Sequence, residues 1–138
     1  MLFKPKKFKY KKFQKGSKLN RITKNFINKN CIYGKLNLVA VSSGTLNSTQ
    51  ILTLKQTISK IIKKKGKLRV NVFPNIGISK KPSEVRMGKG KGNLDHWLFK
   101  IKKGVSICEI ETKLITIGIK ALKSVRYKIP IETKVIKY

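Results

Sequence analysis

Residues 46–73, LNSTQILTLKQTISKIIKKKGKLRVNVF, contain a well-delimited helix followed by an alternating strand, and this order decides the fold class. Asn47 is a favourable N-cap, and Gln50 stands at the third helical position, as in a capping box. From Ile51 onward, aliphatic residues recur at helical spacing and form an apolar stripe. The lysines at the end of the helix suit either a solvated face or contact with phosphates, and Gly66 is expected to stop the helix.

The strand at residues 67–73 is predicted from strict alternation. Leu68, Val70 and Val72 alternate with basic or polar residues, so one face should be buried and the other basic. Pro74 should end this strand because proline cannot donate to a sheet ladder.

Segments on both sides add further strands. A strand is expected at residues 35–41, where aliphatic residues dominate before a Ser-Ser-Gly turn. Residues 74–93 are rich in Pro, Gly and Lys, and we expect them to form one long loop. Residues 94–101 resume a strand pattern, and the turn at residues 102–104 should lead into a paired strand at residues 105–110.

The C-terminal region, residues 114–129, is interpreted as a helix, although three alternating isoleucines near its start also permit a strand. The residues that can share one helical face are Leu114, Gly118, Ala121, Leu122, Val125 and Ile129. Pro130 should break this helix, and residues 131–138 could add an edge strand.

The order of elements predicts an α+β fold, a two-layer sandwich of a mainly antiparallel sheet with about two helices. Residues 1–34 are expected to form an extended basic N-terminal arm. Residues 35–138 should form a single domain that carries the long Gly/Lys loop at residues 74–93.

The charge is large and unevenly distributed. The chain has 34 Lys or Arg and five Asp or Glu in 138 residues, for a formal net charge of +29. Residues 1–83 hold 21 basic residues and no acid, whereas residues 84–138 hold 13 basic and five acidic residues. Such self-repulsion disfavours a solitary compact protein, so a polyanionic partner is expected.

The arm and one loop are the candidate sites for that polyanion. Phe3, Phe8, Tyr10, Phe13 and Phe26 interleave with the arm's lysines, so the arm is either a solvated tail or a segment whose rings stack on bases.

The loop motif, VRMGKGKGN at residues 85–93, alternates three glycines with cations and could thread into a phosphate-rich groove. Its spacing fits neither a Walker A loop nor a dinucleotide fingerprint, and a mobile surface loop is the alternative.

Composition and spacing argue against an enzyme, a metal site and a membrane protein. His96 and Asp95 are neighbours, but alternation in a strand should point them to opposite faces. Glu109 and Glu111 are interpreted as charge partners of nearby lysines. The two cysteines, at positions 31 and 108, are interpreted as small apolar fillers, and no apolar run is long enough to span a membrane.

The residues resemble the family of large-subunit ribosomal protein sixteen of bacteria and organelles, the counterpart of large-subunit ribosomal protein ten of eukaryotes and archaea. The resemblance runs nearly end to end, except over residues 17–34, where it is lost. The matching residues are Met1-Leu2, Pro5-Lys6-Lys7, Lys15-Gly16, Leu46, Gln50-Ile51, Gly66-Lys67, Val72-Phe73-Pro74, Lys81-Pro82, Val85 to Asn93, Trp97 and Ile129-Pro130-Ile131.

The resemblance implies a structural protein of the large ribosomal subunit that binds rRNA and helps to position tRNA near the peptidyl-transferase centre, without catalysis or a cofactor. Its implied partners are large-subunit rRNA, tRNA and neighbouring large-subunit proteins, with no membrane and no independent homo-oligomer. The hypothesised rRNA contacts are Lys4, Lys6, Lys7, Lys9, Lys11, Lys12, Lys15, Lys18, Arg21, Lys63, Lys64, Lys67 and Arg69. The loop facing tRNA or rRNA would comprise Lys81, Arg86, Met87, Gly88, Lys89, Gly90, Lys91 and Gly92.

Charge alone leaves a rival class open, a free-standing basic nucleic-acid-binding protein or RNA chaperone. The abundance of Lys, Ile and Asn indicates an AT-rich genome, and no extension precedes the start of the family pattern. The expected location is therefore a mitochondrial ribosome with an organelle-encoded protein, and a plastid or a bacterial cytoplasm are the alternatives.

Overall fold

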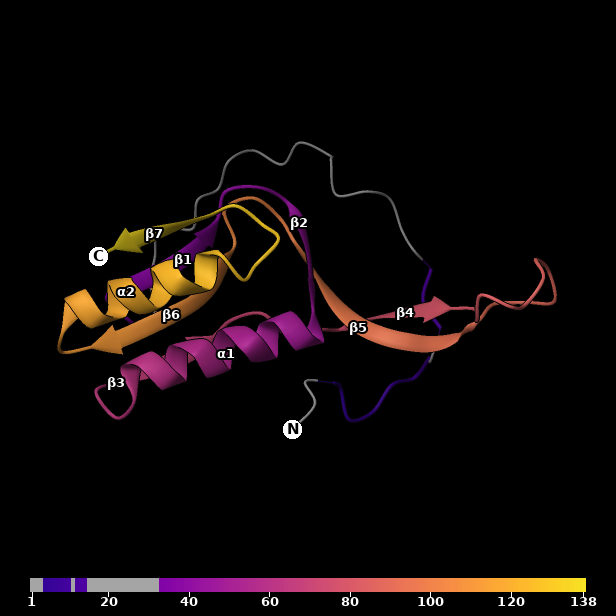
Figure 1. The fold of residues 1–138 in the computed structure, drawn as a ribbon, viewed down its shortest axis with the longest axis horizontal. Coiled ribbons are helices and arrows are strands. Elements are labelled where there is room, and N and C mark those ends of the chain that lie inside the picture. The colour runs from indigo at the N-terminus through magenta and orange to yellow at the C-terminus, as the bar shows by residue number, and fades with distance from the viewer. Residues whose placement is uncertain (1–3, 11, 15–32) are drawn as a thin grey trace.

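The fold joins two antiparallel sheets and two helices, and Figure 1 shows it in a computed structural model that describes residues 4–10, 12–14 and 33–138. The elements in chain order are β1 (Leu36–Ala40), β2 (Gly44–Asn47), α1 (Ser48–Ile62), β3 (Gly66–Val70), β4 (Ile76–Lys80), β5 (Asn93–Ile101), β6 (Ser106–Thr112), α2 (Ile115–Arg126) and β7 (Thr133–Lys137).

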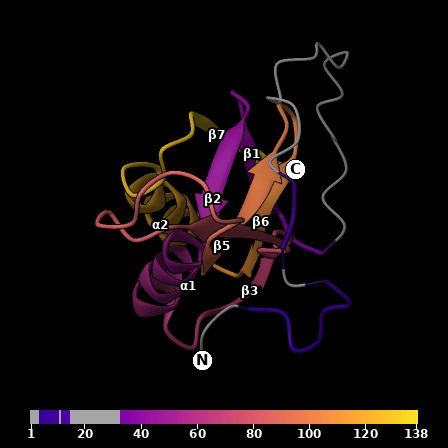
Figure 2. The ribbon, with the colours of Figure 1, turned by 90° about the vertical axis from the view of Figure 1, so that its right-hand side faces the viewer.

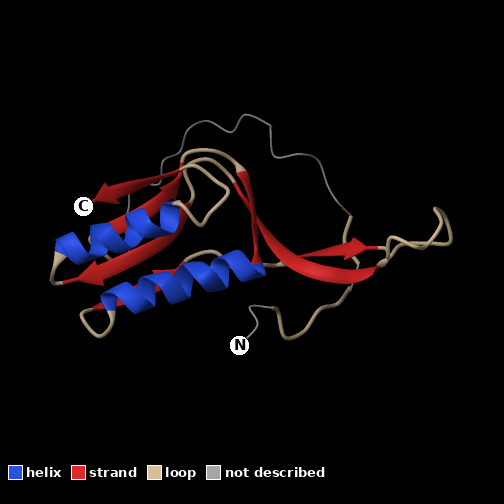
Figure 3. Ribbon diagram, viewed as in Figure 1, coloured by secondary structure: helices blue, strands red, loops and turns tan. Residues whose placement is uncertain are grey.

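The two sheets have different roles. The four-stranded sheet has the order β3-β6-β1-β7, and both helices lie side by side against one of its faces (Figures 1 and 2). The three-stranded sheet has the order β2-β5-β4. Figure 3 shows the long strand β5 leading away from the helical layer, so that the loop between β4 and β5 lies at one end of the molecule. The α+β class and the two helices are confirmed, and the strands are divided between two sheets.

The core lies between the helices and the four-stranded sheet. Ile51, Leu54 and Ile58 of α1 are buried, as the apolar stripe predicted. They share one cluster with Leu36 of β1 and Ile110 of β6, which are paired across the two strands. Burial of a large aliphatic side chain contributes roughly 1.5–3 kcal/mol, so this cluster is the main source of stability for the layer.

The start of α1 is as predicted, but its end is not. The Asn47 backbone N–H donates to Gln50 Oε1 at 2.9 Å, which is one half of the capping box. The helix ends at Ile62, and Lys63 takes the positive φ of 54°. Gly66 instead begins β3, where a Cβ would lie 2.6 Å from the Glu111 carbonyl oxygen, so close approach to β6 explains the glycine.

Strand β3 is shorter than predicted, although its facial alternation is confirmed. It ends at Val70, whereas the strand was expected to run to residue 73. Val72 is nevertheless buried, and Lys67 and Arg69 are exposed.

The prediction of one loop over residues 74–93 is wrong, because β4 occupies part of it. Five residues at its start pair with β5 in antiparallel register. Gly77 lies within this strand. A larger residue does not fit there, because a Cβ would lie 2.4 Å from Leu94 Cδ1 and 3.2 Å from Trp97 Cζ3. The glycine that resembled a loop residue makes room for large side chains of β5.

The expected hairpin around residues 102–104 is also wrong. The turn exists, and Gly104 has a φ of 87°, but β5 and β6 belong to different sheets. The turn is instead held by β1: the Gly104 N–H donates to the Ala40 carbonyl at 2.8 Å, and the Ala40 N–H donates to the Val105 carbonyl at 3.0 Å. The chain therefore changes sheets at this turn.

The C-terminal helix and edge strand are confirmed, but α2 ends at Arg126, before Pro130 could break it, so Leu114 and Ile129 both lie outside the helix. Gly118, Ala121, Leu122 and Val125 are buried on one face of α2. Leu114 is half exposed, because it precedes the first helical turn as the N-cap. Strand β7 lies at the edge of the four-stranded sheet, paired with β1.

Candidate nucleic-acid interface

In the described part of the arm, two phenylalanine rings are partly buried and the lysines are exposed. Phe8 and Phe13 are partly buried. The exposed lysines in the described residues of the arm are Lys4, Lys6, Lys7, Lys9 and Lys12. The hypothesised contacts Lys11, Lys15, Lys18 and Arg21 lie outside the described residues, as do Phe3, Phe26 and Cys31.

The two partly buried rings attach the arm to β5. Phe8 stacks on Trp97, with ring centroids 4.4 Å apart and an interplanar angle of 26°. Phe13 makes edge contacts with Phe8 at 5.7 Å and with Trp97 at 6.2 Å. Phe8 and Phe13 therefore pack on Trp97 instead of presenting their faces to bases, and the described lysines of the arm remain in solvent.

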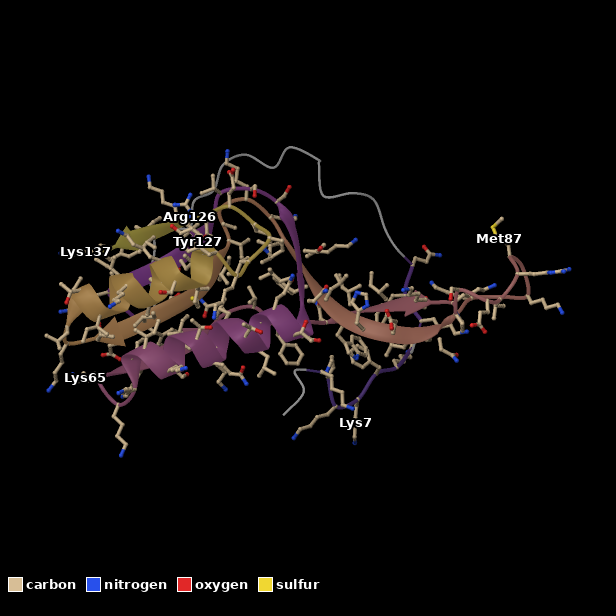
Figure 4. The ribbon with its side chains drawn as sticks, in the orientation of Figure 1. Lys7, Lys65, Met87, Arg126, Tyr127 and Lys137 are labelled. Atoms are coloured by element: carbon tan, nitrogen blue, oxygen red, sulfur yellow. The ribbon has the colours of Figure 1, made fainter. Side chains whose placement is uncertain are left out.

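The tip of the loop between β4 and β5 owes its shape to positive φ angles. Gly88, Lys89 and Gly90 have φ values of 99°, 52° and 86°. A Cβ at Gly88 or Gly90 would meet nothing within 4 Å, so conformation, rather than space within the protein, favours glycine there. Met87 is 100% exposed, and Figure 4 shows it at the tip of the loop.

One lysine of the predicted loop holds the loop itself. Lys81 Nζ donates to the Gly88 carbonyl and so ties the start of the loop to its tip. A Cβ at Gly92 would lie 2.5 Å from the Lys80 carbonyl oxygen, so only glycine allows the two sides of the loop to approach. Arg86 and Lys89 are exposed and have no hydrogen-bond partner among the described residues, which leaves them available to an anion.

The arm and the loop are joined by a reciprocal pair of contacts that sequence reasoning did not predict. Lys12 Nζ donates to the Lys91 carbonyl at 2.9 Å, and Lys91 Nζ donates to the Phe13 carbonyl. These residues are almost 80 positions apart, and no local pattern signals their contact. The described arm, β4, β5 and the loop thus form one cationic projection, which we define as residues 4–10, 12–14 and 76–101.

The lysines at the turn between α1 and β3 form a second, separate cationic region. Lys63, Lys64, Lys65 and Lys67 are all exposed. Figure 4 shows Lys65 at the opposite end of the molecule from Met87, so the structure does not bring the predicted contacts into one site.

Arg69 has an intramolecular role. Its guanidinium lies over the Tyr33 ring, 3.4 Å from the centroid, and Arg69 pairs across the sheet with Glu109. A cation–π contact of this kind competes with phosphate binding by the same group. Arg69 is therefore a weaker candidate for an RNA contact than the exposed lysines beside it.

The interpretation of Glu109 as a charge partner of lysines is not supported. Its carboxylate is buried and accepts hydrogen bonds from the Tyr33 backbone N–H at 2.9 Å and from Asn71 Nδ2 at 2.8 Å. Burial, with a further contribution from the charge of Glu109, raises the pKa of the Cys108 thiol, which remains a buried, unreactive filler as expected.

The expectation that Asp95 and His96 point apart is wrong. His96 Nδ1 and Asp95 Oδ2 are 2.9 Å apart. Ile78 of β4 lies opposite His96, but the next residue, Ser79, lies opposite Leu94. This shift of register leaves Asp95 with no residue opposite it on β4 and breaks the alternation of side chains along β5. Both side chains are partly exposed, at 40% for His96 and 48% for Asp95, and no cluster of three or more potential metal ligands occurs in the described residues.

Comparison with known proteins gives a consistent result. Residues 5–136 match the family of ribosomal protein L16p/L10e. The chain is 42% identical over 136 residues to the large ribosomal subunit protein uL16 of Blochmanniella pennsylvanica, with 99% of this chain and 98% of the relative covered. It is 37% identical over 135 residues to the large ribosomal subunit protein uL16c of Euglena longa, with 98% of each covered.

These matches define a ribosomal protein of the large subunit. The chain belongs to the ribosomal protein L16p/L10e family, as its residues in the loop and the arm indicated. Among the described residues, no helix has the length and apolar character needed to cross a membrane.

Proposed function

We propose that this chain is a structural, non-catalytic constituent of the large ribosomal subunit that binds rRNA and helps to position tRNA near the aminoacyl and peptidyl sites. The observation that carries the proposal is the joining of arm and loop by Lys12, Lys91, Phe13 and Trp97 into one cationic projection. Its partners are large-subunit rRNA, tRNA and neighbouring ribosomal proteins.

The two parts of the projection suit different partners. The described lysines of the arm are all exposed, which fits neutralisation of several rRNA phosphates. The loop is thin because of its glycines, and Arg86 and Lys89 extend from it without partners among the described residues. A thin loop with free cations can enter a groove between two RNA molecules, which supports a role beside tRNA.

For the compartment, we propose a mitochondrial ribosome, with a plastid or a bacterial cytoplasm as alternatives. The abundance of Lys, Ile and Asn supports an AT-rich genome. Fractionation of the source cells, followed by detection of the chain in the ribosomes of each compartment, tests this assignment.

Arg86→Ala, or deletion of Gly88 to Gly92, is expected to weaken tRNA binding more than subunit assembly. Loss of one charge-assisted contact costs about 1.5 kcal/mol, so Arg86→Ala should lower tRNA affinity roughly tenfold. Filter binding of tRNA to purified ribosomes measures the first effect, and gradient sedimentation of subunits measures the second.

Lys103→Ala is the matched control, because Lys103 is an exposed cation on a different turn. Tenfold weaker tRNA binding in the Lys103 variant would assign the effect to net charge alone. Defective assembly with normal tRNA binding in the Arg86 variant would contradict a loop that faces tRNA.

A further inference from the structure

The outer face of α2 carries a groove that is distant from the arm and the loop. It is lined mainly by apolar surface, from the side chains of Thr116, Ile119, Lys120, Lys123, Ser124 and Tyr127. Figure 4 shows Tyr127 at the end of α2, far from Met87 at the loop tip. The groove lies outside every set of residues that the sequence predicted to bind RNA.

The ring of Tyr127 is the most unusual feature of this groove. It is 89% exposed, although a tyrosine ring gains free energy when its apolar body is covered. Tyr127 follows the last helical residue with a φ of −76° and a ψ of −9°, which continues the helical course. The ring therefore stands at the end of a fixed helix as a platform with no covering group among the described residues.

The two charged residues that line the groove, Lys120 and Lys123, are both basic. Residues 113–131 contain five basic residues and no Asp or Glu. Lys120 and Lys123 are exposed, and neither has a hydrogen-bond partner among the described residues. The Ser124 hydroxyl donates to the Lys120 carbonyl at 3.0 Å, so this polar group of the groove is already satisfied.

We propose that this groove binds one unpaired nucleotide of rRNA, with its base stacked on Tyr127 and adjacent phosphates bound by Lys120 and Lys123. This site deepens the proposed function and rests on it. Lys123 and Tyr127 are four residues apart, roughly 6 Å along the helix axis, which fits a base and its own phosphate. RNA-binding proteins commonly recognise unpaired bases by stacking them on aromatic rings.

An acidic protein segment is the other chemistry that the lysines could attract. It would pair with Lys120 and Lys123, but its carboxylates would gain nothing from the exposed face of Tyr127. A nucleotide uses the ring and the cations together, so the observations favour RNA.

The test compares large subunits assembled with the unaltered chain, Tyr127→Ala and Tyr127→Phe. At least one rRNA nucleotide should be protected from base-modifying reagents in subunits that carry the unaltered chain or Tyr127→Phe. The same nucleotide should react with the reagent in subunits that carry Tyr127→Ala. A second measurement is the affinity of the free chain for a single-stranded uridine decamer. Tyr127→Ala removes one stacked base, so it should weaken the binding at this site roughly 5- to 150-fold. Lys134→Ala, an exposed cation on β7, is the control and should leave both readouts unchanged.

A photoreactive benzoylphenylalanine in place of Tyr127 identifies the occupant directly. Crosslinking to rRNA supports the proposal, whereas crosslinking only to a protein overturns it. If the variants enter subunits and the alanine variant shows unchanged reactivity at every nucleotide, this site fails while the proposed function stands. If the unaltered chain does not enter subunits, the proposed function itself fails.

Discussion

Trp97→Ala is expected to release the arm from β5 and to lower the free energy of unfolding by about 3 kcal/mol. The Trp97 indole stacks on Phe8, with ring centroids 4.4 Å apart, and makes an edge contact with Phe13, with centroids 6.2 Å apart. Its removal therefore abolishes both ring contacts together. Gly77 would then face a cavity where the indole now lies. Urea unfolding followed by circular dichroism measures the loss of stability, and tryptic cleavage at the arm's lysines measures its release.

Trp97→Phe is the matched control, because it keeps a flat ring at the same position. We expect it to retain slow cleavage of the arm and most of the stability. If the arm of Trp97→Ala is cleaved no faster than that of the unaltered chain, the aromatic contacts do not hold the arm, and the hydrogen bonds of Lys12 and Lys91 must join it to the loop.

The second large effect is the dependence of rRNA affinity on salt. The exposed cations of the described arm, the loop and the region from the end of α1 into β3 whose side chains make no hydrogen bond among the described residues are Lys4, Lys6, Lys7, Lys9, Lys63, Lys64, Lys65, Lys67, Arg86 and Lys89. Contact with roughly ten phosphates gives a slope near −9 in a plot of log affinity against log salt. Affinity for a large-subunit rRNA transcript should therefore fall roughly 10⁵-fold between 50 and 200 mM salt.

A charge variant assigns this slope to the arm. Replacing Lys4, Lys6, Lys7 and Lys9 with glutamine should make the slope shallower by about four, because each phosphate contact contributes about one. Lys102→Gln with Lys103→Gln removes exposed charge from a turn outside the proposed interface and should leave the slope nearly unchanged. Equal slopes for the arm variant and the unaltered chain would contradict phosphate binding by the arm.

Local patterns in the sequence predicted the helices and most strands well. The apolar stripe that begins at Ile51 predicted the buried face of α1, and the small residue Gly118 correctly marked the buried face of α2. These features depend on periodicity and capping, which act within a few residues. The loop from residue 85 to residue 93 was recognisable because its glycines and cations are adjacent in the chain.

Features that depend on distant residues were missed or misplaced. Strand β4 is short and contains Gly77, and only its pairing with β5 makes it a strand. The separation of β5 from β6 depends on their partners in different sheets, which a turn sequence cannot specify. The contact of Lys12 with Lys91, and the shift of register that brings Asp95 to His96, also arise from tertiary packing.

The central claim is that the chain works as a bound component of the large ribosomal subunit. Sucrose-gradient sedimentation of a lysate, with an antibody against the chain, tests it most directly. We predict that the chain comigrates with large subunits and translating ribosomes and moves with the large subunit when the two subunits are separated at low magnesium. A pool that stays on DNA or free RNA, with none in large subunits, would contradict the account and support a free-standing nucleic-acid-binding protein.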